Sequence, residues 1–387
     1  MGVQPPISVS SQGETAVASA PFRSDWRQRG SEAFELFGNS TARRMVRLDL
    51  WGQPAQIYAN ANLSIYSGQT CNASCAFCVE ELRPISRGRA LVRHVEADAS
   101  RYFHRLDATL HALIPLSPSV AITGGEPSRD PRLPGILQVM GQHPLRKKTL
   151  TTNASGLWHE YGGRSVLRHL LDAGLHHLNI SRAHADPSRN NALMAMRDGL
   201  DEQKLARAIH IAESEGLPVR LSCVLLREGV GTVDGVLKYL RFARDIGVQS
   251  VIFRQLMRPD PSTTQPVGVA RYCARQRVDM RPLLEQLTAR DGVTFVRQVM
   301  GYYYYVEVWR VPVGDALMTV TFESADLRHL EQQKRKHPER IHELVFHPDA
   351  QLCSTWQPWD GRLGPPTAVT ELPQRDADHD HDPSLKA

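Results

Sequence analysis

Hydrophobic positions along the middle of the chain alternate between two periods. Short runs rich in β-branched residues predict strands, and between them apolar residues recur every three or four positions, as on one face of a helix. The predicted strands are Asn62–Tyr66, Val120–Thr123, Thr149–Thr152, His177–Ser181, Val219–Leu225 and Val251–Gln255. The predicted helices are Val95–Leu113, Leu133–Gly141, Ser165–Ala173, Glu202–Glu215 and Asp234–Ile246.

This repeated strand and helix order predicts parallel strands joined by right-handed crossovers. Six such units are too few to close an eight-stranded barrel. The expected fold class is therefore α/β, a partial (β/α)6 open TIM-like barrel over residues 61–260. Functional loops are expected at the carboxyl ends of its strands, as in barrels generally.

The flanking segments predict additions to this barrel. Met45–Trp51, a turn at Gly52-Gln53-Pro54 and Ala55–Ala61 predict a hairpin, so residues 26–60 are expected to form an N-terminal helix and hairpin. A C-terminal α+β extension is expected over residues 261–365. Its predicted parts are a helix near Met280–Ala289, a hairpin of Tyr302–Arg310 and Leu317–Glu323, a basic helix Asp326–Lys336, and the strands Ile341–His347 and Leu352–Trp356. Residues 1–25 and 366–387 lack periodicity and are expected to be disordered.

Three cysteines, Cys71, Cys75 and Cys78, follow the first predicted strand within one short loop. At this spacing their sulfurs can converge on one compact centre, and thiolates are the ligands of iron–sulfur clusters. Three thiolates on a cluster of four irons would leave one iron open to a small molecule that carries an amine and a carboxylate. The alternative is a structural zinc loop completed by a distant His or Cys.

A second motif, Ile122-Thr-Gly-Gly-Glu-Pro127, ends the second predicted strand. Gly124 and Gly125 allow the backbone to approach a ligand closely, and Glu126 offers a carboxylate to an ammonium group. Polar residues also end the third and fourth strands: Thr152, Asn153, Ser181 and Arg182. Such residues either face a ligand or cap the next helix.

The cysteine loop, with Phe77 before its last cysteine, and the Gly-Gly-Glu-Pro turn one unit later together resemble the radical S-adenosylmethionine (SAM) superfamily. The resemblance implies a 4Fe-4S cluster held by Cys71, Cys75 and Cys78. It also implies SAM bound by Phe77, Gly124, Gly125, Glu126, Thr152, Asn153, Ser181, Arg182 and Met257. The activity implied is reductive cleavage of SAM to a 5′-deoxyadenosyl radical, which removes hydrogen from a small-molecule substrate. A reducing partner such as a flavodoxin or ferredoxin is expected, and the substrate-side catalytic residues are left open.

Within that superfamily the layout is most similar to the molybdenum-cofactor cyclase branch. Two departures weigh against that activity: the extension holds only Cys273 and Cys353, too few for a second three-cysteine cluster, and the chain ends in Ser-Leu-Lys-Ala rather than Gly-Gly. The leading hypothesis is therefore a radical SAM enzyme that acts on a sugar, nucleoside or amino-acid derivative in biosynthesis. A cyclase of the molybdenum-cofactor type is the alternative.

Composition and charge bear on which other classes of function are possible. The net charge of +5 is compatible with an anionic substrate. Basic residues at 271–277 and 328–340 raise an RNA-binding or RNA-modifying alternative, but they lack an aromatic stacking platform, so nucleic acid is not expected as a partner. No run of about 18 apolar residues could span a membrane. Residues 1–25 lack the features of a secretory signal, which predicts a cytoplasmic protein.

Overall fold

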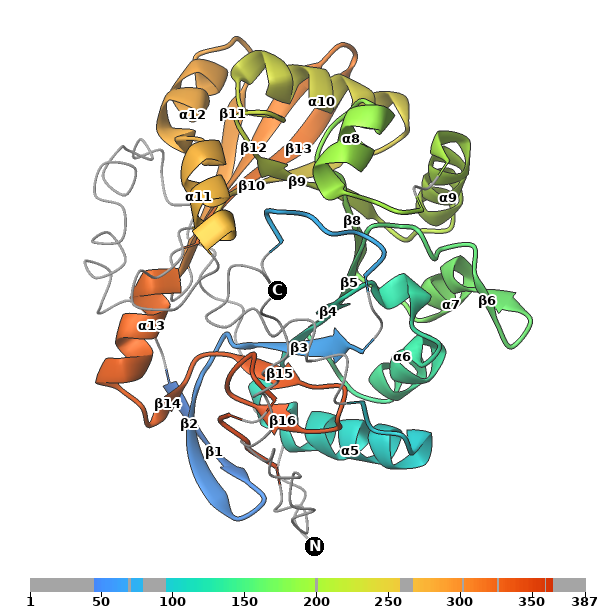
Figure 1. Ribbon diagram of the computed structural model, residues 1–387, viewed down its shortest axis with the longest axis vertical. Helices are drawn as coiled ribbons and strands as arrows, with labels where there is room; N and C mark the ends of the chain where they lie inside the picture. Colours follow the sequence, from blue (N-terminus) through green and yellow to red (C-terminus); the bar gives the residue numbers. More distant parts are fainter. Residues whose placement is uncertain are drawn as a thin grey trace, which may run out of the picture.

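One curved sheet organises the chain, shown here as a computed structural model (Figure 1). The structure describes residues 45–68, 71–78, 95–198, 201–257, 267–300, 303–325, 327–358 and 360–364. The two segments predicted to be disordered and the predicted N-terminal helix lie outside these ranges. No helix within them is both long enough and apolar enough to cross a lipid bilayer.

All six predicted strands are confirmed and run parallel to one another. They are β3 (Asn62–Ser67), β4 (Ser119–Gly124), β5 (Lys147–Thr152), β8 (His177–Ser181), β9 (Val219–Leu225) and β10 (Ser250–Gln255), adjacent in that order. The predicted bounds agree with the observed ones to within two residues, because each strand carries a β-branched run that ends at a turn signal.

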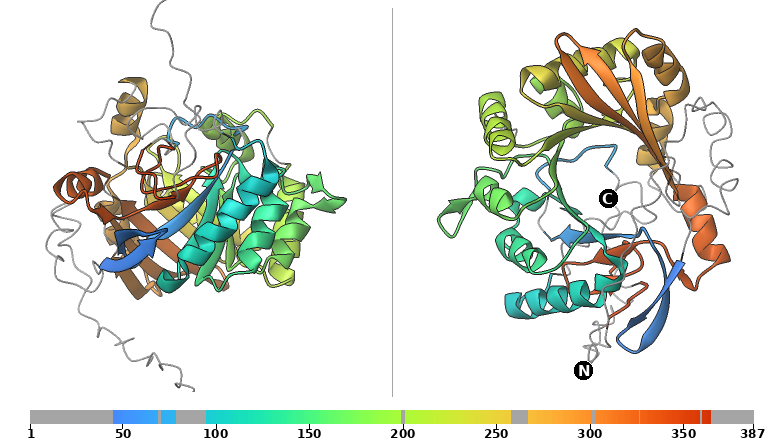
Figure 2. Two further views of the ribbon diagram at one scale, coloured as in Figure 1. Left: turned by 90° about the horizontal axis from the view of Figure 1, so that it is seen from below. Right: turned by 180° about the vertical axis from the view of Figure 1, so that it is seen from behind.

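The predicted helices cover the outer, convex face of this sheet (Figures 1 and 2). They are α5 (Ala99–Ala112), α6 (Leu133–Gly141), α7 (Val166–Asp172), α9 (Glu202–Ser214) and α10 (Val233–Asp245). Helix α5 begins four residues later than predicted, because the Asp98 side chain accepts the N–H of Arg101 and caps the helix there. The hydrophobic core lies between the helices and the sheet, where Leu205 and Ile209 of α9 pack with Leu178 and Val219.

The C-terminal part of the chain completes both edges of the sheet. Strand β13 (Ala316–Ala325) pairs in parallel with β10 at one edge, and β15 (Leu344–Phe346) pairs in parallel with β3 at the other. Antiparallel strands lie outside them: β12 (Tyr304–Val313) and β11 (Thr294–Met300) beyond β13, and β16 (Leu352–Cys353) beyond β15. In the described ranges β11 and β16 do not pair with each other, so the barrel is open, as predicted.

The predicted N-terminal hairpin is confirmed as β1 (Met45–Leu50) and β2 (Gln53–Tyr58), but its turn lies elsewhere. The turn consists of Trp51 and Gly52, both with positive φ (53° and 81°), as a two-residue hairpin turn requires. Pro54, predicted as a turn residue, pairs with Asp49 inside the ladder. Strand β14 (Arg340–Ile341) adds to β2 in parallel.

Of the longer elements, three were not predicted from the sequence: α8 (Pro187–Met194), α11 (Val267–Gln276) and β11. Helix α8 buries only Asn190 and Met194, so it has no apolar stripe for periodicity to detect. Strand β11 exposes both Phe295 and Val296 and therefore lacks a clear alternation. The remaining elements are α12 (Met280–Thr288), α13 (Leu327–Lys336), β6 (Glu160–Tyr161), β7 (Arg164–Ser165) and the 3-10 turns η2 (Ile114–Leu116) and η3 (Pro127–Arg129).

Candidate metal and cofactor site

The cysteine loop follows the carboxyl end of β3, at the edge of the sheet where the sequence placed it. Cys71, Cys75 and Cys78 are all half-buried, and the N–H of Cys78 donates to the carbonyl of Cys75 at 3.0 Å. Burial raises the pKa of the Cys75 thiol, and the neighbouring sulfurs of Cys78 and Cys71 raise it further. The three sulfurs therefore influence one another electrostatically, as groups that share one small region do.

The end of α8 and the residues that follow it hold one side of this loop. The Met194 carbonyl accepts the N–H of Ser74 at 3.1 Å and the thiol of Cys75 at 3.3 Å. The Asn72 carbonyl in turn accepts the N–H of Arg197 at 2.9 Å, and the Asn72 amide donates to the Asp198 carbonyl at 3.0 Å. The sequence did not predict this support, although Asp186-Pro187 is a helix-start signal that indicates α8.

Asn153, directly after β5, holds the inner side of the loop. Its amide nitrogen donates to the Asn72 side-chain oxygen at 2.8 Å and lies 3.8 Å from the sulfur of Cys71. The Asn153 side-chain oxygen accepts the N–H of Ser155 at 3.0 Å, which fixes the orientation of the amide. The structure thus brings two predicted site residues, Asn153 and Cys71, together.

Gly124 is required where the ends of β3 and β4 approach each other. Its φ of +119° is in the region that favours glycine, and a Cβ there would lie 2.6 Å from the backbone nitrogen of Ser67. Gly125 follows directly and is half-buried. Gly124 therefore permits a close approach of β4 to β3, and the predicted approach of the paired glycines to a ligand stays a prediction.

Gly124→Ala is expected to lower the free energy of unfolding by about 2–4 kcal/mol, because it adds both a backbone clash and a strained φ. Urea denaturation of the purified protein measures this change. The matched control is Gly141→Ala at the end of α6, where a Cβ meets nothing within 4 Å. That control should change stability by no more than about 1 kcal/mol. Equal effects of the two substitutions would contradict the assignment.

Glu126 lies under the glycines, with only 1% of its surface exposed. One carboxylate oxygen accepts the N–H of Ser128 at 3.0 Å, the Ser128 hydroxyl at 2.6 Å and the Thr152 hydroxyl, and the other accepts the N–H of Asn153 at 2.7 Å. Burial raises the pKa of this carboxyl, while the four hydrogen bonds act in the opposite direction. Glu126 therefore joins the ends of β4 and β5. Its contact with a ligand ammonium group stays a prediction.

Arg182 is also engaged by the chain itself. Its side chain is 5% exposed and donates to the carbonyls of His184 and Ala185, both at 3.0 Å, and to Glu202 at 2.8 Å. Its guanidinium also stacks 4.6 Å from the ring of Phe242. These contacts indicate that Arg182 fixes the loop after β8, and its predicted contact with a ligand carboxylate stays untested.

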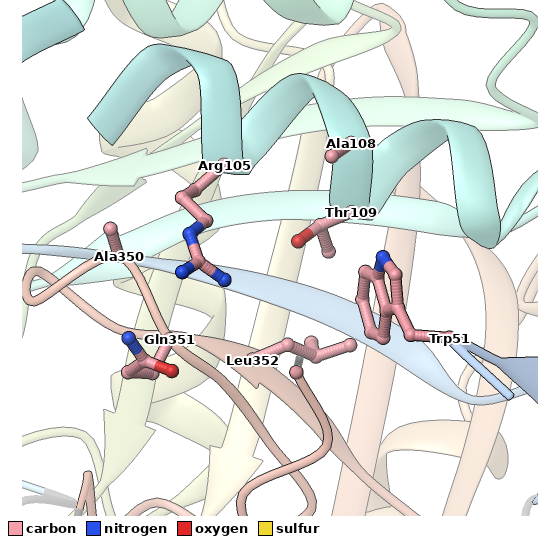
Figure 3. A pocket seen from close by; sticks show the side chains of 8 residues that line it. Trp51, Arg105, Ala108, Thr109, Ala350, Gln351 and Leu352 are labelled. Carbon is pink, nitrogen blue, oxygen red and sulfur yellow. The ribbon is translucent and has the colours of Figure 1, made fainter. Parts of the chain in front are cut away.

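Ser181, at the end of β8, is half-buried and lines a small, shallow pocket. Asn153, Asn190 and Asn191 line the same pocket. A second small pocket lies between α5 and the turn before β16, where Arg105, Thr109 and Gln351 point inward (Figure 3). None of the predicted site residues lines that second pocket. The pocket at Ser181 is therefore the one that belongs to the candidate site.

Phe77 and Met257, both predicted to lie near an adenine ring, pack against the same small apolar cluster. Its buried members are Leu226, Leu256 and Cys273, and Leu193, Val224 and Tyr272 pack around them. This cluster joins the cysteine loop to the ends of β9 and β10 and to α8 and α11. The sequence did not single out Leu193, Leu226 or Tyr272, because core residues of this kind carry no distinguishing motif.

Three thiolates can serve either a zinc ion or an iron–sulfur cluster. A tetrahedral zinc ion needs sulfurs about 3.8 Å apart, given Zn–S bonds of about 2.3 Å. Among the described residues, no three His, Cys, Asp or Glu side chains are grouped to hold one metal ion. A four-iron cluster binds each thiolate at a separate iron and so needs wider spacing. Within the described residues the three half-buried thiols do not form a closed site for a single ion, and their assignment to a cluster stays a prediction from the motif.

A known family model matches the central part of the chain. Residues 65–252, which run from β3 into β10 and include both motifs, match the family model of the radical SAM superfamily. The chain contains a radical SAM domain. The resemblance stated from the two motifs is thereby confirmed, and the cofactors of this family are a 4Fe-4S cluster and SAM. The cysteine loop at the edge of the radical SAM domain supplies thiolates suited to such a cluster.

Two curated proteins similar to this chain share the same name. Two proteins named "Probable GTP 3',8-cyclase", from Metallosphaera sedula and Sulfolobus acidocaldarius, are each 26% identical, over 58% and 57% of this chain. The chain spans about 60% of the length of these curated relatives. Among solved structures, Streptococcus suis SuiB is 14% identical, with a TM-score of 0.48 over 78% of this chain and 61% of SuiB.

Proposed function

We propose that the chain is a radical SAM enzyme that acts on a small-molecule biosynthetic substrate. Cys71, Cys75 and Cys78 would hold the 4Fe-4S cluster. The observation that carries the proposal is the bonding of the cysteine loop on two sides, to Asn153 after β5 and to Met194 at the end of α8. When bound, the cluster and SAM supply one-electron cleavage of the sulfonium and a radical that removes hydrogen from carbon.

The residues of the chain would orient these groups. Gly124 and Gly125 allow the backbone to approach the methionine part of SAM, and the buried carboxylate of Glu126 fixes that turn against β5. Phe77 and Met257 present apolar surface, which suits a purine ring and excludes water from it. Asn153 orients Cys71 through Asn72, so that a single network links the proposed metal ligands to the proposed cofactor residues.

A GTP 3',8-cyclase activity is a second candidate, because two relatives carry that name. The cysteines outside the loop weigh against it, as the sequence indicated. Cys223 lies in the core of β9, Cys273 on α11 and Cys353 on β16, each buried and free. In the described ranges these three do not form a second group of metal ligands. We therefore keep the general radical SAM activity as the first proposal.

Anaerobic reconstitution with iron and sulfide tests the proposal. The loaded protein is expected to absorb at about 400 nm, as thiolate-bound iron–sulfur clusters do. After reduction by dithionite, or by a flavodoxin or ferredoxin, it should convert SAM to methionine and 5′-deoxyadenosine. Deuterated sugars, nucleosides, amino acids and GTP then identify the substrate by transfer of label into 5′-deoxyadenosine. A colourless protein that holds zinc and leaves SAM intact would overturn the proposal.

A further inference from the structure

The inner face of the sheet, opposite the helices, is polar. In β9 the residues Val219 and Leu221 face outward and are buried in the core. Arg220 and Ser222, which alternate with them, are half-buried and face inward. In β8 Leu178 faces outward in the same way. A closed barrel usually fills its interior with branched apolar side chains. A polar interior instead indicates that polar groups of a ligand are bound there.

Strand register places several cations on this inner face. Lys147 and Thr149 share one face of β5, and Thr149 pairs with His177 of β8. Two residues further along β8, Asn179 pairs with Arg220 of β9. Paired residues on neighbouring strands project to the same side of a sheet. Lys147, His177 and Arg220 therefore lie on one continuous surface.

The same surface continues to the far edge of the sheet. Ser222 of β9 pairs with Ile252 of β10, which pairs with Thr321 of β13. Thr321 in turn pairs with Val308 of β12, and Val308 pairs with Arg297 of β11. Each step keeps the side chain on the same side. Arg254 of β10 lies on that side as well, because it is two residues beyond Ile252. Four cations therefore share this surface, which we call the inner cationic face: Lys147, Arg220, Arg254 and Arg297.

Electrostatic effects within the inner cationic face confirm that its members are near one another. Burial and the positive charges of Arg220, Arg297 and Arg146 lower the pKa of Lys147. Burial and the charges of Arg254 and Arg297 lower the pKa of Arg220, while Glu323 opposes them. Burial, Arg220 and Lys147 lower the pKa of His177 to about 3. The cations repel one another in a partly desolvated region.

Few acidic groups balance this charge. Glu323 of β13 forms an ion pair with Arg254. Arg220 donates through Nε to the Ser250 hydroxyl at 3.2 Å. In the part of the chain that the structure describes, no carboxylate pairs with Lys147, Arg220 or Arg297. Lys147 and Arg220 are half-buried, whereas Arg297 is exposed. Half-buried cations without an acidic partner are costly for a folded protein, and a bound anion removes that cost.

We propose that the inner cationic face binds a phosphate or diphosphate group of the substrate, chiefly through Lys147 and Arg220. This inference rests on the proposed function, whose substrate it narrows to a phosphorylated molecule. Guanidinium groups bind phosphate in a bidentate manner, and an ammonium adds a point charge. Two half-buried cations without an acidic partner suit a multiply charged phosphate group better than a single carboxylate.

Members of the inner cationic face lie at different distances from the cofactor residues. Lys147 begins β5, and Thr152, beside the cofactor residues, ends it. A strand rises about 3.3 Å per residue, so these two residues lie about 16 Å apart along β5. Arg220, however, is in register with Thr151 near the end of β5, through Asn179 of β8. A phosphate on Arg220 would therefore lie near the cofactor residues, and one on Lys147 would lie farther from them along the strand.

Calorimetric titration of the cluster-loaded protein with pyrophosphate tests the inference. Wild type is expected to bind one pyrophosphate, and Lys147→Met and Arg220→Met should each weaken binding at least about ten-fold. The matched control is Lys238→Met, which removes the same charge from an exposed position on α10. It should leave pyrophosphate binding unchanged. Unchanged binding in the first two variants, or equal weakening in the control, would overturn the inference.

Two further measurements separate the possible failures. Cleavage of SAM without substrate should be the same in wild type, Lys147→Met and Arg220→Met, because neither residue belongs to the proposed cofactor site. Loss of SAM cleavage in wild type contradicts the proposed function, whatever the pyrophosphate result. Acetate, a singly charged carboxylate, should fail to displace pyrophosphate. Displacement of pyrophosphate by equimolar acetate would reject the phosphate class. A thermal midpoint for each variant shows that it is folded.

Discussion

Cys75→Ala is expected to abolish both cluster loading and SAM cleavage. The two remaining thiolates are not enough to hold the cluster, so the absorbance at about 400 nm should disappear. Formation of 5′-deoxyadenosine should fall at least about 1,000-fold, since the loss of one member of a unit that acts together removes the whole effect. Iron and sulfide analysis after anaerobic reconstitution, with chromatography of the SAM products, measures both changes.

Cys353→Ala is the matched control for this prediction. Cys353 is a free, fully buried cysteine on β16, the strand at one edge of the sheet, and it is not part of the cysteine loop. Its loss should leave the iron content and SAM cleavage of the reconstituted protein unchanged. Circular dichroism is expected to show the same fold in both variants, because the thiol of Cys75 is only half-buried. A Cys75→Ala protein that still forms 5′-deoxyadenosine would refute the cluster assignment.

Glu126→Gln is expected to lower both the stability of the protein and its affinity for SAM, and it acts through structure. A glutamine side chain has only one oxygen that accepts hydrogen bonds, so its NH2 group would face either the N–H of Asn153 or the donors at Ser128 and Thr152. A buried donor without a partner costs about 1–3 kcal/mol of unfolding free energy. Urea denaturation should show that loss, and the dissociation constant for SAM should rise together with it.

The control for Glu126→Gln is Glu160→Gln, at an exposed position of β6. A surface substitution of this kind should change stability by no more than about 0.5 kcal/mol. The two measurements also separate two roles of Glu126. Lower stability with weaker SAM binding indicates that Glu126 positions the ends of β4 and β5. Weaker SAM binding at unchanged stability would instead show that the carboxylate contacts the ligand directly.

Local patterns in the sequence were enough to predict the six parallel strands and five outer helices. Each of these elements buries one face, so the periods of two and 3.6 residues are visible in the chain. Helix α8 shows the limit of that reasoning. It exists to present the Met194 carbonyl to the cysteine loop, and it buries too few apolar side chains to be recognised.

In the candidate site, too, some features could be predicted from the sequence and others could not. The spacing of Cys71, Cys75 and Cys78 predicts a metal centre from the sequence alone, because the ligands are neighbours in the chain. The supports of that centre are not neighbours: Asn153 reaches Asn72 across 81 residues, and Glu126 reaches Asn153 across 27. Hydrogen bonds between such distant residues depend on the final packing of the strands, which the sequence pattern does not contain.

The way in which the sheet is completed has a consequence for synthesis of the protein on the ribosome. Strands β3 and β10 are the outermost of the first six, and their outer partners, β15 and β13, are translated only after residue 315. Until then both strands present rows of unpaired N–H and C=O groups, which are templates for association with other chains. A nascent chain therefore depends on its last stretch of translation, or on a chaperone, to protect those edges from aggregation.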